Sequence, residues 1–271
     1  MVKFDLHTHH DRCGHASGVI EHYIEAAIEA DLTAIGISDH SPYFGREEDQ
    51  YQPGIAMAKS AFAGYVEEVL ALKEKYRDRI EVLLGVESDY FSEHLELYRE
   101  VYAKYPFDYI IGSVHQIRGV SIFNRNRWKK LDTSLHKDEK IHYYEQIRDS
   151  ANTGLFQVLG HIDAMKGYYP AFSDIAGAEE AIDDALRAVA ANDIAIEINT
   201  SGSTKDVGGW YPSDAILERA LHFGVDVTFG SDAHVPARVG EDWEKVQARL
   251  REIGFSRWCF YRQKEKVVVP L

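Results

Sequence analysis

Six short apolar runs in this sequence are each followed directly by a histidine or a carboxylate, and this pattern constrains the fold more than any other feature. The runs span residues 4–6, 34–38, 82–86, 109–114, 156–160 and 225–231. Runs of this length with little alternation are typical of parallel strands that are covered on both faces. Because the carboxyl ends of such strands meet at one mouth, we expect the residues that follow them to lie together. These residues are His7, His9, Asp39, His40, Glu87, His115, His161, Asp232 and His234.

Helical patterns separate the apolar runs. They cover residues 20–30, 58–76, 94–105, 137–154, 176–191, 212–223 and 241–253, and a further strand is expected at 194–198. Strand–helix alternation repeated about seven times predicts an α/β fold with a parallel sheet, open or closed, in a single domain over residues 1–271. The segments 39–53 and 117–132 have no periodicity and follow ligand-bearing strands, so we predict active-site loops there. Residues 266–270 are predicted to form an edge strand or a tail.

Composition excludes several classes of protein. A net charge of −14 argues against a broad basic surface for nucleic acid, so we expect no nucleic-acid partner. Cys13 and Cys259 form no close-spaced pair, which argues against a disulfide framework or a zinc ribbon. A ligand role for Cys13 stays open because it lies among histidines. With no signal-peptide pattern and no apolar run long enough to span a bilayer, we expect a cytoplasmic protein without a membrane partner.

The histidines and carboxylates at the strand ends indicate a metal site. His7 and His9 are two residues apart, so on a strand both side chains lie on one face, and His15 follows on a loop that can fold back. Glu87 and Asp232 follow apolar strands, where a carboxylate without a partner is costly; a salt bridge to an arginine is the alternative to a metal. One strand-end histidine alone would more often be a core residue, but four at the same end favour a shared role: His40, His115, His161 and His234.

Mixed histidine and carboxylate ligands suit zinc, iron or manganese better than calcium or magnesium, which prefer oxygen ligands. The candidates outnumber the three or four ligands of one catalytic zinc, so several ions with a shared carboxylate are expected. Such a cluster can bind a phosphate, generate hydroxide near neutral pH and stabilise an in-line displacement at phosphorus. The sequence therefore predicts a hydrolase of phosphate esters.

The order and spacing of these motifs resemble the PHP (polymerase and histidinol phosphatase) family over nearly the whole chain. The resemblance implies a distorted (β/α)7 barrel of mainly parallel strands, with three divalent ions at the C-terminal strand ends. It implies one ion held by His7, His9, Glu87 and Asp232, a second held by Glu87, His115 and His161, and a third held by His15, His40 and His234.

Within that family, four segments are similar to the monofunctional histidinol-phosphate phosphatases of histidine biosynthesis: residues 7–16, 38–42, 112–115 and 197–202. This similarity implies hydrolysis of L-histidinol phosphate by attack of a metal-bound hydroxide. Two segments depart from the family pattern, because Gln116 stands where an aromatic residue is expected and Ser203-Thr204-Lys205 stands where an apolar residue and an arginine are expected.

Several further residues lie just beyond strand ends, where they could contact substrate. The candidates for phosphate or substrate contact are Arg12, Arg118, Asn199, Lys205 and Arg238, and those for proton delivery to the leaving alkoxide are His10 and Asp163. For each cation taken alone a solvated surface position is the alternative, and for Asn199 it is a cap.

Three other functions fit parts of the pattern. One is a PHP phosphoesterase that acts on a nucleotide or another phosphomonoester, with the acidic surface arguing against a polynucleotide. Another is a metal-dependent binding module without catalysis, against which the intact ligand set argues. An amidohydrolase-type barrel fits less well, because a glutamate stands where a bridging lysine would be sought. The sequence leaves the native metals and the oligomeric state open.

Overall fold

The computed structural model describes residues 2–130 and 132–271, which form an α/β fold of mainly parallel strands. One sheet has the order β1 (Phe4–Asp5), β2 (Ala34–Ile37) and β3 (Glu81–Leu84). The other has the order β10 (Asp226–Gly230), β9 (Ala195–Asn199), β8 (Val158–Leu159), β5 (Ile111–Ser113) and β4 (Glu87–Asp89). All neighbours in both sheets are parallel, as the apolar runs predict.

Backbone contacts join the two sheets at both of their borders. Beside β10, the amide of Leu6 donates to the carbonyl of Phe229 at 3.0 Å, and Thr8 forms a parallel bridge with Ala233. Beside β2, the amide of Glu87 donates to the carbonyl of Ser38 at 2.9 Å. The strand ends of the two sheets are therefore held next to each other.

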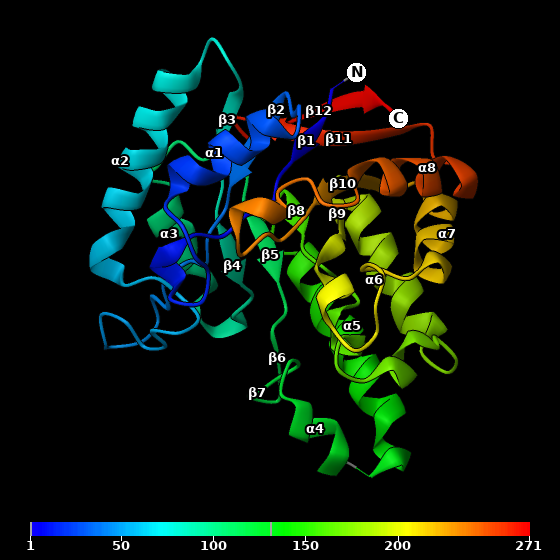
Figure 1. The fold of residues 1–271 in the computed structure, drawn as a ribbon. Coiled ribbons are helices and arrows are strands. Elements are labelled where there is room, and N and C mark those ends of the chain that lie inside the picture. The colour runs from blue at the N-terminus through cyan, green and yellow to red at the C-terminus, as the bar shows by residue number, and fades with distance from the viewer. Residues whose placement is uncertain (1, 131) are drawn as a thin grey trace.

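Helices pack on the outside of the strands, with α1–α3 on one side and α5–α8 on the other (Figure 1). In α6, the buried residues Ile182, Ala185, Leu186 and Val189 recur at helical spacing, so one stripe faces the core. The bounds are α1 Ile20–Glu29, α2 Lys59–Tyr76, α3 Leu95–Tyr102, α5 His136–Ala151, α6 Glu179–Ala191, α7 Asp214–His222 and α8 Trp243–Ile253. All seven predicted helices are present, with ends shifted by up to three residues.

The segment predicted as the loop 117–132 is more structured than expected. It carries most of an antiparallel pair, β6 (Gln116–Ile117) with β7 (Val120–Ser121), and then the short helix α4 (Arg125–Lys130). Figure 1 shows these elements projecting below the strand ends. Leu131, at the end of this segment, lies outside the described residues.

A C-terminal hairpin covers the opposite end of the strands. The predicted edge strand is β12 (Glu265–Pro270), and it pairs antiparallel with β11 (Arg257–Arg262), which the sequence analysis did not predict. Trp258 packs on Phe4 with ring centroids 5.0 Å apart and on Trp243 at 4.7 Å. The hairpin thus packs on β1 in the upper part of the view in Figure 1, and the first predicted metal ligands follow the opposite end of β1. Among the described residues, no helix is both long enough and apolar enough to cross a bilayer.

Candidate metal centre

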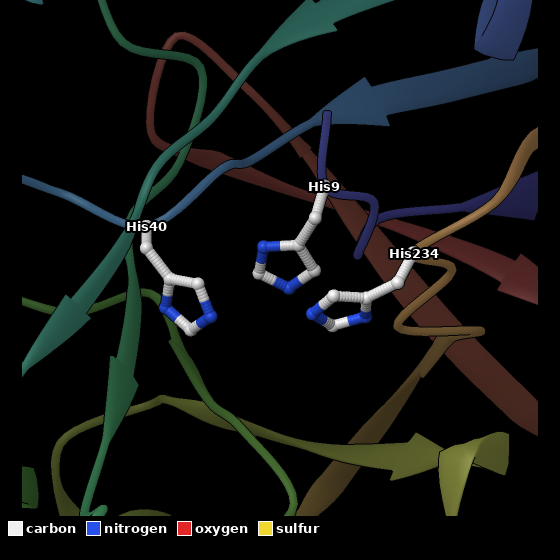
Figure 2. A group of neighbouring side chains, drawn as sticks. All are labelled: His9, His40 and His234. Atoms are coloured by element: carbon white, nitrogen blue, oxygen red, sulfur yellow. The ribbon is translucent and has the colours of Figure 1, made fainter. Parts of the chain in front are cut away.

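The residues predicted as metal ligands converge at the C-terminal ends of the parallel strands. Figure 2 shows His9, His40 and His234, which come from three separate strand ends, with their rings turned toward one another. The ring centroid of His9 lies 4.3 Å from that of His40 and 4.2 Å from that of His234. Segments more than two hundred residues apart in sequence are therefore neighbours here.

Glu87 lies at the centre of this cluster and is buried. Its Oε1 atom lies 3.0 Å from Nε2 of His161 and 3.3 Å from Nε2 of His115. Its Oε2 atom faces three other rings, at 2.7 Å from Nδ1 of His40, 3.5 Å from Nε2 of His7 and 3.6 Å from Nε2 of His9. A carboxylate whose two oxygens face separate groups of imidazoles has the geometry of a bridging ligand.

Asp232, His15 and His234 complete the cluster. Oδ1 of Asp232 lies 3.0 Å from Nε2 of His9 and 3.9 Å from Nε2 of His7. The Nε2 atoms of His15 and His234 face each other at 2.8 Å. Two imidazole nitrogens that close need a proton or a cation between them, since both otherwise present lone pairs.

Backbone strain occurs at two of these positions. The φ angles are 53° at Asp232 and 28° at His161, a region that residues other than glycine rarely adopt. Such strain persists where the surrounding fold imposes it, and it is typical of ligand-binding sites. Here it turns both side chains toward Glu87 and its neighbours.

The donor set fits divalent ions. Among the described residues, Nε2 of His7 is buried without a hydrogen-bond partner, which is costly unless something else satisfies it. Donor atoms close enough to share an ion occur in three groups made up only of predicted ligands: His9, His40 and His234; His7, His9 and Asp232; and His40, Glu87 and His115. A fourth group contains Cys13 with His9 and Asp39, but Cys13 donates to the carbonyl of His10 at 3.1 Å.

Carboxylates behind the histidines fix the orientation of their rings. Glu197 lies 2.7 Å from Nδ1 of His7, Asp89 lies 2.6 Å from Nδ1 of His115, and Asp39 lies 3.2 Å from Nδ1 of His9. Such partners set the tautomer that leaves Nε2 free for a metal. Asp39 was expected at the strand ends with the candidate ligands, whereas Asp89 and Glu197 were not among the predicted site residues. The signals that could have found them are a glutamate inside a buried strand and an aspartate two residues after Glu87.

Burial and neighbouring charges shift the pKa values of the site residues in different directions. Burial alone would raise the pKa of Glu87, but His40, His7 and His115 hold it well below its usual range. Burial lowers the pKa of His9, yet Asp232 and Asp39 overcome this and raise it to about 9. Burial, followed by His40 and His9, lowers the pKa of His15 to about 4, so this imidazole is neutral at pH 7. Glu87 and His15 are therefore in the forms that bind metals, whereas His9 carries a proton that a bound ion would displace.

The cluster opens into a cavity of about 770 Å³. Of the predicted substrate-contact residues, Lys205 and Arg238 line it, and Arg238 donates to Ser203 Oγ at 2.9 Å and is paired with Glu241. Asn199 lies behind the cavity, where its amide donates to Glu197 at 2.9 Å and to Asp232 at 3.3 Å.

Four predicted residues do not line the cavity. Arg12 pairs with Glu68 at 2.5 Å, and Arg118 pairs with Glu139 at 2.5 Å and with Asp138 at 2.8 Å. His10 is buried against Asp39 at 3.2 Å and the ring of Tyr65. Asp163 is buried in an ion pair with Lys166 at 2.6 Å. The polar group of each is paired with residues that do not line the cavity.

Comparison with known proteins agrees with this geometry. The PHP domain family matches residues 5–201. A probable histidinol-phosphatase of Deinococcus radiodurans is 29% identical over 96% of this chain and 97% of its own length. The histidinol-phosphatase of Bacillus subtilis is also 29% identical, over 92% of this chain and 100% of its own length.

Solved structures show the same fold. The histidinol phosphate phosphatase of Lactococcus lactis, crystallised with zinc, L-histidinol and phosphate, superposes with a TM-score of 0.81 at 21% identity, over 98% of both chains. A histidinol phosphatase structure from Listeria monocytogenes gives a TM-score of 0.79 at 23% identity, over 90% of this chain and 99% of that one. The match of the family to most of the chain, together with these relatives, shows that the protein belongs to the PHP domain family.

Proposed function

We propose that this protein is a metal-dependent phosphatase that hydrolyses L-histidinol phosphate to L-histidinol and phosphate. The observation that carries the proposal is the buried carboxylate of Glu87, with five imidazole nitrogens within 3.6 Å, at the edge of an open cavity. The names of the relatives and the ligands of the Lactococcus lactis structure support the choice of substrate.

Three divalent ions would occupy the centre in this proposal. His7, His9, Glu87 and Asp232 would hold the first, Glu87 with His115 and His161 the second, and His15, His40 and His234 the third. Zinc is supported by the Lactococcus lactis structure, and iron and manganese accept the same donors. Bound ions of this kind act as Lewis acids toward a phosphoryl group and lower the pKa of water.

Other residues of the chain would orient the metal ligands or contact the substrate. Asp39, Asp89 and Glu197 orient the histidines, and Asn199 holds Asp232 by its amide. Lys205 and Arg238 lie where cations could meet phosphoryl oxygens. Arg12, Arg118, His10 and Asp163 have no part in the proposal, because their polar groups face other partners.

We further propose that the two sheets close into a distorted (β/α)7 barrel within a single domain. The backbone contacts between β1 and β10, and between the residues after β2 and β4, support closure. In such a barrel the strand ends form one mouth, which is where the cluster lies.

The test compares wild-type protein with Glu87→Ala and with Glu100→Ala, which removes an exposed carboxylate on α3. Metal content and turnover are measured on L-histidinol phosphate and on a panel of other phosphomonoesters. We expect Glu87→Ala to lose bound metal and at least about a thousandfold in kcat/KM while it stays folded, and Glu100→Ala to match the wild type. Full activity of Glu87→Ala would exclude the bridging role. If metal-loaded wild-type protein hydrolyses only another ester, the proposed substrate is wrong. If it hydrolyses none of the esters, the proposed catalytic function is wrong.

A further inference from the structure

Lys205 differs from the other charged side chains of the cavity wall. Arg238 is neutralised by Glu241, and Glu87 and Asp232 belong to the histidine cluster. Among the described residues, no carboxylate lies within ion-pair distance of the Lys205 ammonium group. The ammonium group lies near two aromatic rings instead: Nζ is 5.9 Å from the ring centroid of Phe123 and 5.8 Å from that of Tyr168.

The two rings form one unit with the candidate metal centre, which we call the aromatic clamp (Phe123 and Tyr168). Their centroids lie 6.3 Å apart at 81°, so the rings meet edge to face. Phe123 also lies 5.9 Å from the ring of His115 and 6.4 Å from that of His161. The clamp therefore spans the distance between Lys205 and two of the histidines that face Glu87.

The backbone that carries Lys205 is fixed as well. Asp206, the next residue, accepts from Arg125 at 2.7 Å, and the Arg125 guanidinium lies 4.0 Å from the ring centroid of Tyr168. Arg125 thus neutralises the carboxylate that is adjacent to Lys205 in sequence. As a result, the loop is held against α4, and no acid of the described part of the chain pairs with the lysine.

An aromatic face and a carboxylate can both hold an ammonium group, but they affect its ability to bind an anion differently. A carboxylate cancels its charge and competes with an incoming anion, whereas a ring attracts it through a quadrupole that carries no net charge. The flexible four-carbon side chain of lysine otherwise loses rotamer freedom when it binds. A lysine beside rings is therefore restrained without a carboxylate that would compete with an incoming phosphate.

We infer that Phe123 and Tyr168 are positioning residues that hold Lys205 as an uncompensated cation for the phosphoryl group of the substrate. This inference rests on the proposed phosphatase function. It assigns a role to the segment of residues 116–130 and to the loop after β9, which depart from the family pattern at Gln116 and at Lys205. The substrate phosphate, and not the leaving group, is the part that the clamp serves.

The experiment measures metal content, KM and kcat with L-histidinol phosphate, and the inhibition constant of inorganic phosphate. We expect Lys205→Met to raise KM and the phosphate inhibition constant by about tenfold or more with metal content unchanged, since a charge-assisted contact is lost. Phe123→Leu and Tyr168→Leu should each raise both constants by about three- to tenfold. Tyr168→Phe, which keeps the ring, should restore most of the loss seen in Tyr168→Leu. The matched control is Phe223→Leu, which removes a ring that Arg187 covers at 4.9 Å outside the cavity, and it should leave both constants as in the wild type.

A double-mutant cycle separates positioning from general packing. If Phe123 acts through Lys205, Phe123→Leu has no further effect in the Lys205→Met background. An equal effect in both backgrounds, or an unchanged phosphate inhibition constant in Lys205→Met, would overturn the inference. Absence of turnover in the metal-loaded wild type would instead reject the proposed function, and phosphate binding by calorimetry would still test the clamp on its own.

Discussion

At the scale of single residues, the carboxylate of Glu197 contacts three different parts of the candidate centre. Its carboxylate lies 2.7 Å from Nδ1 of His7, accepts from the backbone amide of His161 at 2.9 Å and accepts from Asn199 at 2.9 Å. One buried carboxylate therefore sets the tautomer of one proposed ligand, supports the strained backbone of a second and holds the amide that reaches Asp232.

We predict that Glu197→Gln weakens metal binding without unfolding the protein. The amide keeps the size of the side chain but carries no charge to favour the His7 tautomer, so metal affinity should fall by about 10- to 100-fold. Competition with a chromogenic chelator measures the affinity, and circular dichroism checks the fold. Glu180→Gln, at an exposed position of α6, is the control and should behave as the wild type. Unchanged affinity in Glu197→Gln would show that the backbone alone orients His7.

The ligand types were predictable from the sequence because they directly follow apolar runs, and parallel strands bring their ends together. Asp39 was expected at the strand ends by the same pattern. The contacts of Asp39, Asp89 and Glu197 with histidine rings were not predictable, since such a role depends on a distance to a ring nitrogen rather than on a position in a pattern. The same limit explains why Arg12 and Arg118 were predicted to contact substrate, since both follow strand ends. Their partners Glu68 and Glu139 lie on neighbouring helices, and only the packing of those helices reveals them.

At the scale of elements, the strands and helices that alternate along the chain were predictable, whereas β6, β7, α4 and β11 were not. β6 and β7 have two residues each, too few for a period, and Arg127 holds them by donating to the carbonyls of Ile117 and Val120. β11 pairs with β12 and packs Trp258 and Phe260 on Phe4 of β1, which is a tertiary contact. Local sequence carries little information about such pairings.

The close packing of β2 against the side chain of Tyr109 gives a prediction about stability. A Cβ added to Gly36 would collide with the hydroxyl of Tyr109 and would lie 3.0 Å from Cα of Leu6. That hydroxyl donates to the carbonyl of Leu6 at 2.5 Å, so it has no free space to move into. We expect Gly36→Ala to lower the free energy of unfolding by about 1–3 kcal/mol, measured by urea denaturation.

Gly64→Ala is the matched control for that substitution. Gly64 lies in α2 with no atom within 4 Å of an added Cβ, so the same chemical change should raise the free energy of unfolding by about 0.5–1 kcal/mol. Opposite signs for the two variants support the close approach at β2. Equal effects would show that the strand adjusts to a methyl group, and the packing argument would then fail.

At the scale of the whole molecule, the candidate centre joins residues from nearly the full length of the chain, from His7 to His234. Both sheets contribute through their strand ends, and the buried carboxylates and imidazoles there have few protein partners other than each other. A bound ion would therefore stabilise the folded state specifically, because the unfolded chain does not bring these donors together.

Metal removal should consequently lower the thermal stability of the whole protein. An ion present at a thousand times its Kd adds about 4 kcal/mol to folding, and a chain of this size loses about 2–4 °C in Tm per kcal/mol, so a chelator should lower Tm by roughly 10 °C. Differential scanning calorimetry with and without EDTA measures the shift, and added zinc should reverse it. Glu87→Ala provides the control, since a variant that holds less metal should respond less to the chelator. If the wild type loses all its metal and keeps its Tm, the donors are held in place by the strands alone, and binding does not contribute to the stability of the fold.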